Sequence, residues 1–270
     1  MFVGLVRKNS FYKDLRKFEE NQICDRNLIL NSTFYNQNLC FGAYENEKLM
    51  GLISACVFQK SILINNFYYK KELCLEVKKR LIAILLANIN QNKKSILFLA
   101  TYAEERLFKE FKFKSLAPFT KAKHLKNSDE FNIDKAVKSI KHINFESVLK
   151  KVDLKAFNEN RFNYITKSIF KSSSLILSTN LGYQHSYALN KKLIKLSPWI
   201  MDDLCEDEAN ILIQSVLYHR GIKEIIAFIP TEVKKIVNLY KTYGFKMQED
   251  YKLIYLNTRP SIKLDMIYGF

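Results

Sequence analysis

Apolar residues follow two different periods along this chain, and the two alternate. Near the C-terminus, the apolar run Ile225–Ile229 is closed by Pro230, and an amphipathic pattern then extends from Thr231 to Tyr243. The first run is typical of a buried strand and the second of a helix packed by one face. Gly244 follows, where a backbone with positive φ is needed and a Cβ would clash. The pattern predicts a strand, a helix, a glycine turn and another strand.

The same order of elements occurs about 130 residues earlier in the chain. There the apolar run Ile96–Ala100 is followed by a helical pattern that ends in Leu107–Lys114. A unit that recurs in this way predicts two copies of one domain. A chain of 270 residues is long enough for two such domains, each with its own core.

The elements before this unit differ in number between the two halves. In the first half we expect helices and strands in the order helix Phe11–Asn21, helix Arg26–Tyr35, strands Leu39–Tyr44, Leu49–Phe58 and Ile62–Tyr69, helix Leu73–Asn90, strand Ser95–Ala100, helix Ala103–Phe111 and strand Phe113–Lys121. In the second half we expect helix Phe145–Phe157, strands Leu175–Thr179, Tyr183–Asn190 and Leu193–Ile200, and a helix that starts within Asp202–Glu208. The polar segment Lys123–Glu130 predicts the boundary, which gives domains 1–127 and 128–270.

Composition favours a globular protein with a solvated basic surface. Hydrophobic residues make up 48% and charged residues 26%, with a formal net charge of +16. The lysines are scattered, without a basic tract, zinc-finger spacing or aromatic RNA-binding motif, so we do not expect nucleic acid as the partner. The alternative is binding through general basicity, which would be steeply salt-dependent.

Several other classes of site and location are disfavoured by the sequence. The five cysteines are widely spaced and the four histidines have no partner at a telling spacing, so we expect neither a metal site nor a disulfide framework. Residues 1–9 lack the apolar stretch of a signal peptide. The longest apolar run, Leu81–Ala87, is too short to span a bilayer. We therefore expect a cytoplasmic protein without a membrane partner.

The repeated unit resembles the end of the GCN5-related N-acetyltransferase fold, in which a helix ends in an L-Y-x-x-x-G-F pattern. The second copy has this pattern in full, from Leu239 and Tyr240 to Gly244 and Phe245. The first copy has Phe108 for the tyrosine and Lys112 for the glycine.

Two further features extend the resemblance. Gly51 lies where the family commonly has a glycine in its third strand, and Asp153, Phe157 and Arg161 form the D-x-x-x-F-x-x-x-R arrangement of bacterial tandem members. The resemblance implies an α/β (α+β) protein of two tandem domains. Each would be a mixed, mostly antiparallel sheet flanked by helices.

Acetyl-CoA as co-substrate is the ligand that the resemblance implies. In the family, glycines at the start of the helix after the fourth strand let backbone amides approach the pyrophosphate. Here the matching segment, Leu73–Lys78, has no glycine, although nearby lysines supply positive charge. These lysines are equally consistent with a solvated helix face. We expect CoA in the first half, on these residues: Phe67, Tyr68, Tyr69, Glu76, Val77, Lys78 and Lys79.

The general acid that the resemblance implies is split between the halves. The family's tyrosine protonates the departing thiolate, and Tyr240 occupies that position in the second copy. Phe108 has no ionisable group, so Tyr102 is the candidate acid of the first copy. Acidic residues at the start of the second copy's helix, Asp202 and Asp203 among them, would repel a pyrophosphate. Tyr240 is equally consistent with a packed tyrosine.

The function that follows from the resemblance is acyl-CoA-dependent N-acetylation of an amine on a small molecule or a peptide. The second half would then shape the acceptor pocket. The alternative is a non-catalytic protein of the same fold that binds a ligand or a partner through a degenerate CoA site, which the missing glycines and the phenylalanine favour.

Overall fold

Two compact units make up the computed structural model of this protein, which describes residues 1–16, 29–31, 36–89, 94–125, 145–170, 174–203 and 205–270. Unit 1 comprises Met1–Lys114, Asn163–Phe170 and Ile254–Pro260. Unit 2 comprises Ser115–Phe162, Lys171–Leu253 and Ser261–Phe270. The predicted boundary at residues 127 and 128, and most of the predicted helix Arg26–Tyr35, lie outside the described residues.

Unit 1 contains a sheet whose strands follow the order β1-β2-β3-β4-β5. Its elements are β1 (Phe2–Leu5), α1 (Lys8–Arg16), the 3-10 turn η1 (Gln37–Leu39), β2 (Cys40–Glu45), β3 (Lys48–Val57), β4 (Ser61–Tyr69), α3 (Leu75–Asn88), β5 (Ser95–Thr101), α4 (Tyr102–Lys109) and the π-helical turn η4 (Ile165–Ile169). The pairs β1–β2, β2–β3 and β3–β4 are antiparallel, and β4–β5 is parallel. Ile254–Leu256, the end of β11, also belongs to this unit.

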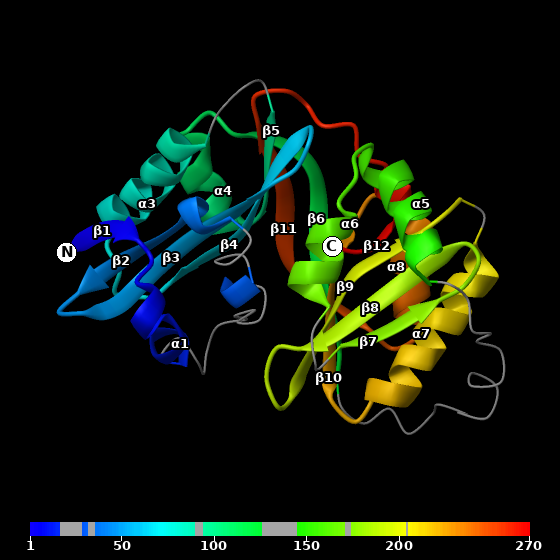
Figure 1. The fold of residues 1–270 in the computed structure, drawn as a ribbon. Coiled ribbons are helices and arrows are strands. Elements are labelled where there is room, and N and C mark those ends of the chain that lie inside the picture. The colour runs from blue at the N-terminus through cyan, green and yellow to red at the C-terminus, as the bar shows by residue number, and fades with distance from the viewer. Residues whose placement is uncertain (17–28, 32–35, 90–93, 126–144, 171–173, 204) are drawn as a thin grey trace. The chain divides into compact units, whose positions relative to one another are not determined.

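The two faces of the unit 1 sheet have separate cores. Ile53 and Ala55 of β3 pack with α3 and α4 in the larger core, whereas Leu52 packs with Leu15 of α1 on the opposite face (Figure 1). This follows from the period of two in a strand, which sends alternate side chains to opposite faces. Gly51 lies where α3 approaches most closely, because a Cβ there would come within 2.7 Å of the Leu73 side chain.

Unit 2 repeats this plan with one extra short strand. Its elements are β6 (Lys114–His124), α5 (Phe145–Phe157), the short helix α6 (Phe162–Tyr164, shared with unit 1), β7 (Leu175–Ser178), β8 (Gly182–Ala188), β9 (Leu193–Met201), α7 (Glu206–Arg220), β10 (Glu224–Pro230), α8 (Lys234–Thr242), β11 (Lys246–Leu256), the 3-10 turn η5 (Leu264–Met266) and β12 (Ile267–Gly269). The strand order is β11-β6-β10-β9-β8-β7, with β12 beside β9. As in unit 1, one pair is parallel, here β9–β10.

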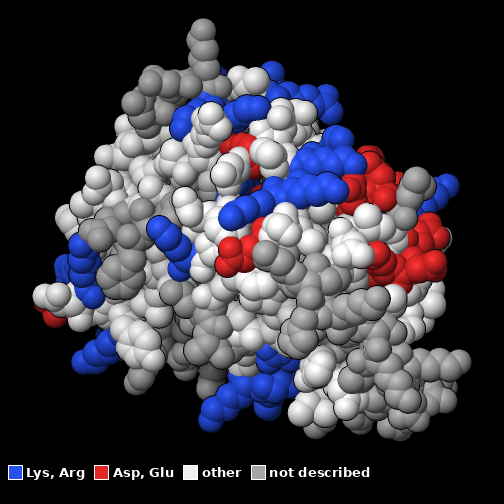
Figure 2. Space-filling model, turned by 45° about the vertical axis from the view of Figure 1, so that its right-hand side comes forward, with Lys and Arg blue, Asp and Glu red and all other residues white. Residues whose placement is uncertain are grey.

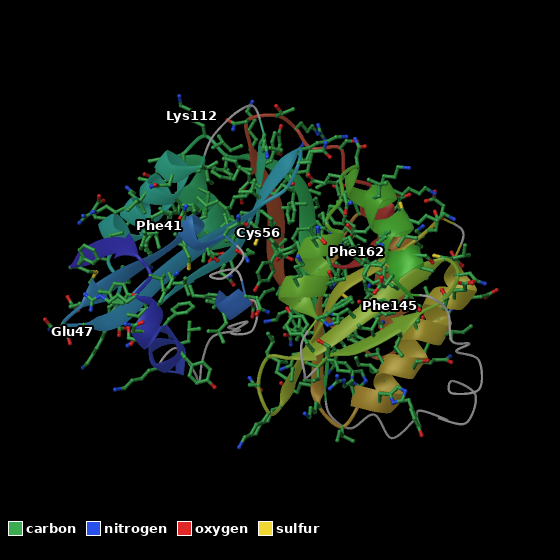
Figure 3. The ribbon with its side chains drawn as sticks, viewed as in Figure 1. Phe41, Glu47, Cys56, Lys112, Phe145 and Phe162 are labelled. Atoms are coloured by element: carbon green, nitrogen blue, oxygen red, sulfur yellow. The ribbon has the colours of Figure 1, made fainter. Side chains whose placement is uncertain are left out.

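The helix and turn that the sequence repeats have the same hydrogen bond in both units. The Phe113 amide donates to the Phe108 carbonyl at 3.3 Å, and the Phe245 amide donates to the Tyr240 carbonyl at 3.0 Å. This bond closes a helix end through a residue with positive φ. That residue is Lys112 with φ 65° in unit 1 and Gly244 with φ 76° in unit 2. The side chain of Lys112 points outward from the end of α4 (Figure 3).

The predicted architecture is confirmed. Both units are mixed and mostly antiparallel sheets flanked by helices, and the predicted helix Phe145–Phe157 matches α5 at both ends. Strand β1 was not predicted, because its four residues are too short to show a period. Strand β6 follows the first copy in sequence but pairs with β10 in unit 2, from Ile225–His124 to Pro230–Phe119. Local pattern does not encode that choice of partner.

Candidate functional site

In unit 1, the strands β4 and β5 pair over part of their length only. The parallel register runs from Ser61–Ser95 to Ile64–Phe98, while β4 continues to Tyr69 and β5 to Thr101. A bulge lies at this point, since the register of β4 with β3 passes from Ile64 to Asn66. A bulge bends its strand and increases the local twist. The last residues of β4 therefore turn away from β5 and present one backbone edge beyond their recorded pairing.

The predicted cofactor residues of β4 lie on this diverging half. Phe67, Tyr68 and Tyr69 pair with Ile53, Leu52 and Gly51 of β3, so only their opposite edge faces the split. The Phe67 side chain is buried, with 5% of its surface exposed. Its role toward a ligand is therefore limited to its backbone.

The first turn of α3 follows directly after this strand. Cys74 is the residue that precedes the helix and makes no side-chain hydrogen bond to its amides. The Lys78 amide already donates to the Cys74 carbonyl at 3.3 Å, so the amides available to a ligand are those of residues 75–77. Of the predicted contacts, Glu76 and Val77 therefore have an amide to offer, whereas Lys78 and Lys79 have only their side chains.

The two lysines differ in how they are held. Lys78 Nζ lies 3.9 Å from the centre of the Tyr69 ring, a cation–π contact at the end of β4. Lys79 Nζ forms ion pairs with Glu110 at 2.9 Å and with Glu76 at 3.6 Å. Lys79 thus neutralises Glu76, the carboxylate that the sequence places near the phosphate position.

Burial and the carboxylate of Glu104 affect Tyr69. Burial, followed by the nearby negative charge of Glu104, raises the pKa of Tyr69 to about 12. Glu104 caps α4: its Oε2 accepts from the Thr101 amide at 2.8 Å and from Thr101 Oγ1 at 2.9 Å. Burial also raises the pKa of Glu104, which the hydrogen bonds from Thr101 oppose. Tyr69, Lys78 and Glu104 thus form a charged rim at the open end of the split.

At the family's tyrosine position in unit 1, Phe108 is fully buried in an aromatic cluster. Its ring centre lies 4.7 Å from that of Phe98, 5.0 Å from that of Phe113 and 5.5 Å from that of Phe67. Edge-to-face packing of this kind stabilises a core. Phe108 holds α4 against the sheet and offers no proton.

The predicted acid Tyr102 lies at the first residue of α4. Its side chain is 59% exposed, and its hydroxyl accepts a hydrogen bond from Arg106 Nη2 at 2.8 Å. The Arg106 guanidinium also lies 4.5 Å from the centre of the same ring. Tyr102 is thus open to solvent and has a cationic neighbour.

In unit 2, the corresponding split between β9 and β10 is occupied by the chain itself. The parallel register of these strands runs from Leu193–Glu224 to Lys195–Ile226. Beyond it, β12 pairs with β9 through Ile267–Ile200 and Gly269–Trp199. On its other side, the Phe270 amide donates to the Phe228 carbonyl of β10 at 3.0 Å.

Tyr240, the predicted acid of the second copy, is fully buried under this strand. Its hydroxyl donates to the Tyr268 carbonyl at 2.6 Å, and its ring contacts those of Trp199 and Phe245. Burial raises the pKa of Tyr240 well above its ordinary value. In this arrangement Tyr240 fastens β12, and a catalytic role would require β12 to leave.

The acidic residues before α7 are held within unit 2. Lys155 Nζ of α5 donates to Asp202 Oδ1 and, at 2.8 Å, to Asp203 Oδ2. Glu208 Oε2 accepts from the Leu181 amide at 2.9 Å. These acids tie α5 and the β7–β8 turn to the start of α7. Because a pyrophosphate would meet these carboxylates, the arrangement opposes CoA in unit 2.

The D-x-x-x-F-x-x-x-R arrangement forms a buried ion pair. Arg161 Nη2 and Nε donate to the two oxygens of Asp153 at 2.6 and 3.0 Å. The guanidinium carbon lies 3.3 Å from the centre of the Phe157 ring, and the Tyr183 hydroxyl donates to Asp153 Oδ1 at 3.1 Å. The motif therefore fastens α5 to β8 and has a structural role.

Asn65 and Asn66, at the bulge of β4, were not predicted as site residues. Asn66 is 1% exposed, and its Oδ1 has no hydrogen-bond partner among the described residues. The available signal was two consecutive amides inside the otherwise apolar strand Ile62–Tyr69. Such a pair costs free energy in a core unless it has a purpose.

Charge is spread over the face shown in Figure 2, where lysine and arginine side chains are interspersed with aspartate and glutamate. Within the described residues, no group of three or more His, Cys, Asp or Glu is arranged to hold a metal ion. None of the helices in the described segments is long and apolar enough to cross a bilayer.

Comparison with known proteins gives similarity at the level of structure. No protein-family model and no curated protein matches the sequence. A protein of Pyrococcus horikoshii, named provisionally as an acetyltransferase, is similar in structure with a TM-score of 0.78 and 17% identity, over 99% of this chain and 93% of that one.

Two further solved structures cover both units. A tandem GNAT protein from the clavulanic acid biosynthesis pathway, solved without acetyl-CoA, has a TM-score of 0.65 and 8% identity over 96% of this chain and 100% of that one. A GCN5-related N-acetyltransferase from Sphaerobacter thermophilus has a TM-score of 0.57 and 10% identity over 98% of both chains. The fold of the present chain is that of these tandem proteins.

Proposed function

Proceeding from the tandem fold of the GCN5-related N-acetyltransferases, we propose that this chain is an acyl-CoA-dependent N-acetyltransferase acting on an amine of a small molecule or a peptide. The observation that carries the proposal is the split in unit 1, where the pairing of β4 with β5 ends at Ile64 and Phe98 while both strands continue. A strand edge with free amide and carbonyl groups can bind an extended amide-containing chain. The pantetheine arm of acetyl-CoA is such a chain.

We assign acetyl-CoA to unit 1 because the two splits differ. In unit 2, β12 already pairs with β9 where a ligand would lie, and Lys155 holds two carboxylates at the start of the following helix. In unit 1, the first turn of α3 has amides without a side-chain cap, and Lys78 lies beside it. A helix N-terminus with an adjacent cation suits a pyrophosphate.

The residues of unit 1 fit the parts of acetyl-CoA as follows. The backbone of Phe67–Tyr69 would pair with the pantetheine arm, and the amides of Glu76 and Val77 would bind the pyrophosphate. The Lys78 ammonium would add a charge-assisted hydrogen bond. Lys79 would keep Glu76 neutralised through the ion pair that it already forms.

The chemistry that acetyl-CoA supplies is an activated acetyl group. The neutral amine forms a C–N bond to the acetyl carbon as the C–S bond breaks, so that the amine loses one proton and the thiolate gains one. A backbone amide at the split would stabilise the carbonyl oxygen, and fixed orientation would supply much of the rate. Tyr102 is the proposed proton donor in unit 1, since Phe108 has none.

Thermal unfolding with and without ligands tests the proposal. Acetyl-CoA and CoA should raise the melting temperature, whereas GTP should not, because only the first two have a pantetheine arm. At a ligand concentration 100 times Kd, the expected stabilisation is about 2.7 kcal/mol. Lys78→Glu should weaken the shift, whereas Lys241→Glu, the same charge change on an exposed residue of α8, should preserve it. No shift at millimolar acetyl-CoA would refute the assignment.

A second candidate is a non-catalytic protein of this fold that binds a ligand or partner. It is favoured by the buried Phe108 cluster in one unit and by β12 over Tyr240 in the other, which leave neither unit with an accessible tyrosine at the family's position. The two candidates differ in turnover. Release of free CoA from acetyl-CoA that depends on added amine would exclude the second.

A further inference from the structure

A chain of polar side chains crosses β3 and β4 on the face opposite to α3 and α4. Asn66 Nδ2 donates to Ser54 Oγ at 2.8 Å, and Ser54 Oγ donates to Asn65 Oδ1 at 2.9 Å. Asn65 Nδ2 then donates to Cys56 Sγ at 3.4 Å. Each donor in this chain is directed at the next residue, so the one acceptor left at its end is Asn66 Oδ1.

The burial of this chain makes the unused acceptor informative. Ser54 is 0% and Asn66 is 1% exposed, and Asn66 Oδ1 has no hydrogen-bond partner within the part of the chain that the structure describes. A buried acceptor without a donor costs free energy, and most buried polar atoms in proteins are paired. Its neighbours fix the amide orientation, so that the oxygen cannot exchange places with the nitrogen without losing the bond to Ser54.

The position of Asn66 in the sheet gives this acceptor a function. Asn65 is the bulged residue of β4, and Ile64, the residue before it, is the last that pairs with β5. Asn66 therefore lies at the start of the split to which acetyl-CoA is assigned. We propose that Asn66 Oδ1 accepts a hydrogen bond from the N–H of the acceptor amine and so orients it for acetyl transfer; this rests on the proposed function.

The chemistry of an amide oxygen suits this role and limits it. It accepts a hydrogen bond from N–H but is too weak a base to remove the proton, so Asn66 is a positioning residue. A buried site without a paired charge also favours the neutral amine over the ammonium ion. The neutral amine is the form whose lone pair can attack the thioester while its N–H bonds to Asn66.

Aromatic residues adjoin the polar chain and indicate the class of amine. Tyr164 hydrogen-bonds to Cys56, which shares the chain with Asn65, and its ring packs edge-on against Phe58 with the centres 5.1 Å apart. Cys56, labelled in Figure 3, is fully buried. We therefore assign a primary amine on an apolar skeleton, for which 2-phenylethylamine is a suitable probe, rather than a polyamine such as spermidine.

Steady-state kinetics of the full chain test this assignment. The rates of acetyl transfer to 2-phenylethylamine and to spermidine are measured for the wild type, Asn66→Leu and Asn66→Asp, and CoA binding is followed separately by thermal shift. Asn66→Leu should lower kcat/KM for 2-phenylethylamine at least 10-fold and leave KM for acetyl-CoA within 2-fold. Asn66→Asp keeps an oxygen at the same place and should retain transfer within 3-fold.

Ser54→Ala is the second variant, because it removes the group that holds Asn66 Nδ2 but leaves Asn66 itself. It should raise KM for 2-phenylethylamine several-fold with the CoA shift unchanged, which a purely structural role of the chain would not produce. Wild-type transfer that neither Asn66→Leu nor Ser54→Ala alters would overturn the site and leave the proposed function standing. Transfer to spermidine alone would overturn the class of amine. A wild type that binds no CoA would overturn the proposed function and this site with it.

Discussion

The Tyr240 hydroxyl and the Tyr268 carbonyl oxygen lie 2.6 Å apart, and the bond between them fastens β12 into the split of unit 2. The residue at the family's general-acid position thus binds the protein's own backbone. In unit 1 the equivalent residue is Phe108, and there no strand corresponding to β12 is described next to β4. Loss of the hydroxyl and retention of an open split occur in the same unit.

Tyr240→Phe should destabilise the protein by about 1–3 kcal/mol, because the Tyr268 carbonyl loses its buried donor. Urea unfolding measures this. Acetyl transfer should be unchanged, since the cofactor is assigned to unit 1. A loss of transfer with unaltered stability would instead support Tyr240 as the general acid. Phe108→Tyr is the matched variant, and it should not increase transfer, because its ring is enclosed by Phe67, Phe98 and Phe113.

Arg161→Met should cost about 3–5 kcal/mol, because it leaves the buried Asp153 carboxylate without its cation. The free energy of unfolding in urea is the readout. The double variant Asp153→Leu with Arg161→Met should recover much of the loss, since no unpaired charge remains. Equal effects of the single and double variants would contradict a coupled ion pair.

Lys112→Gly should stabilise the protein by about 0.5–1 kcal/mol, because Lys112 has a φ of 65° that glycine adopts without strain. Gly244→Ala is the control at the equivalent helix end, where φ is 76°, and it should destabilise by a similar amount. Chemical denaturation of both variants gives the two signs. Opposite signs would show that the two helix ends differ in energy despite their common hydrogen bond.

His185 should make stability fall between pH 6.5 and 4. The ring is buried, Nδ1 donates to the Ser197 carbonyl at 2.6 Å and Nε2 accepts from Ser174 Oγ at 2.8 Å. Burial lowers the pKa of His185 to about 4. Because the unfolded chain binds the proton at higher pH than the folded one, stability is complete above about pH 6.5 and decreases as pH falls. The single-site contribution is on the order of 3 kcal/mol.

Unfolding free energies at intervals between pH 4 and pH 7 measure this slope, with His185→Gln as the comparison. The variant should lose stability at pH 7 but show a flatter profile. A wild-type profile with the same slope as that of the variant would assign the pH dependence to other groups.

Local pattern predicted most of the elements and little of their pairing. The apolar stripe and Gly244 predicted α8 and its turn, since both depend on neighbours in sequence. The pairing of β6 with β10 and the insertion of β12 depend on contacts between residues far apart in sequence, such as Ile229 with Thr120. The resemblance identified the closing strand but not that it would lie over Tyr240.

The candidate site was predicted by place better than by chemistry. The segment Phe67–Lys79 does lie at the split, but Lys79 is bound to Glu110, and Lys78 contacts Tyr69. Asn66 was overlooked because an asparagine in a strand gives no signal until its partners are known. Side-chain pairing of this kind is decided by packing, which periodicity does not record.

Hydrogen exchange with and without CoA tests the central claim, that unit 1 binds CoA and unit 2 does not, most directly. Backbone amides in Asn65–Val77, which include the diverging end of β4 and the first turn of α3, should exchange more slowly when CoA is bound. Amides in Leu196–Ala209, the equivalent segment of unit 2, should exchange at the same rate with and without it. Protection in unit 2 with none in unit 1 would contradict the assignment of the cofactor to the first split.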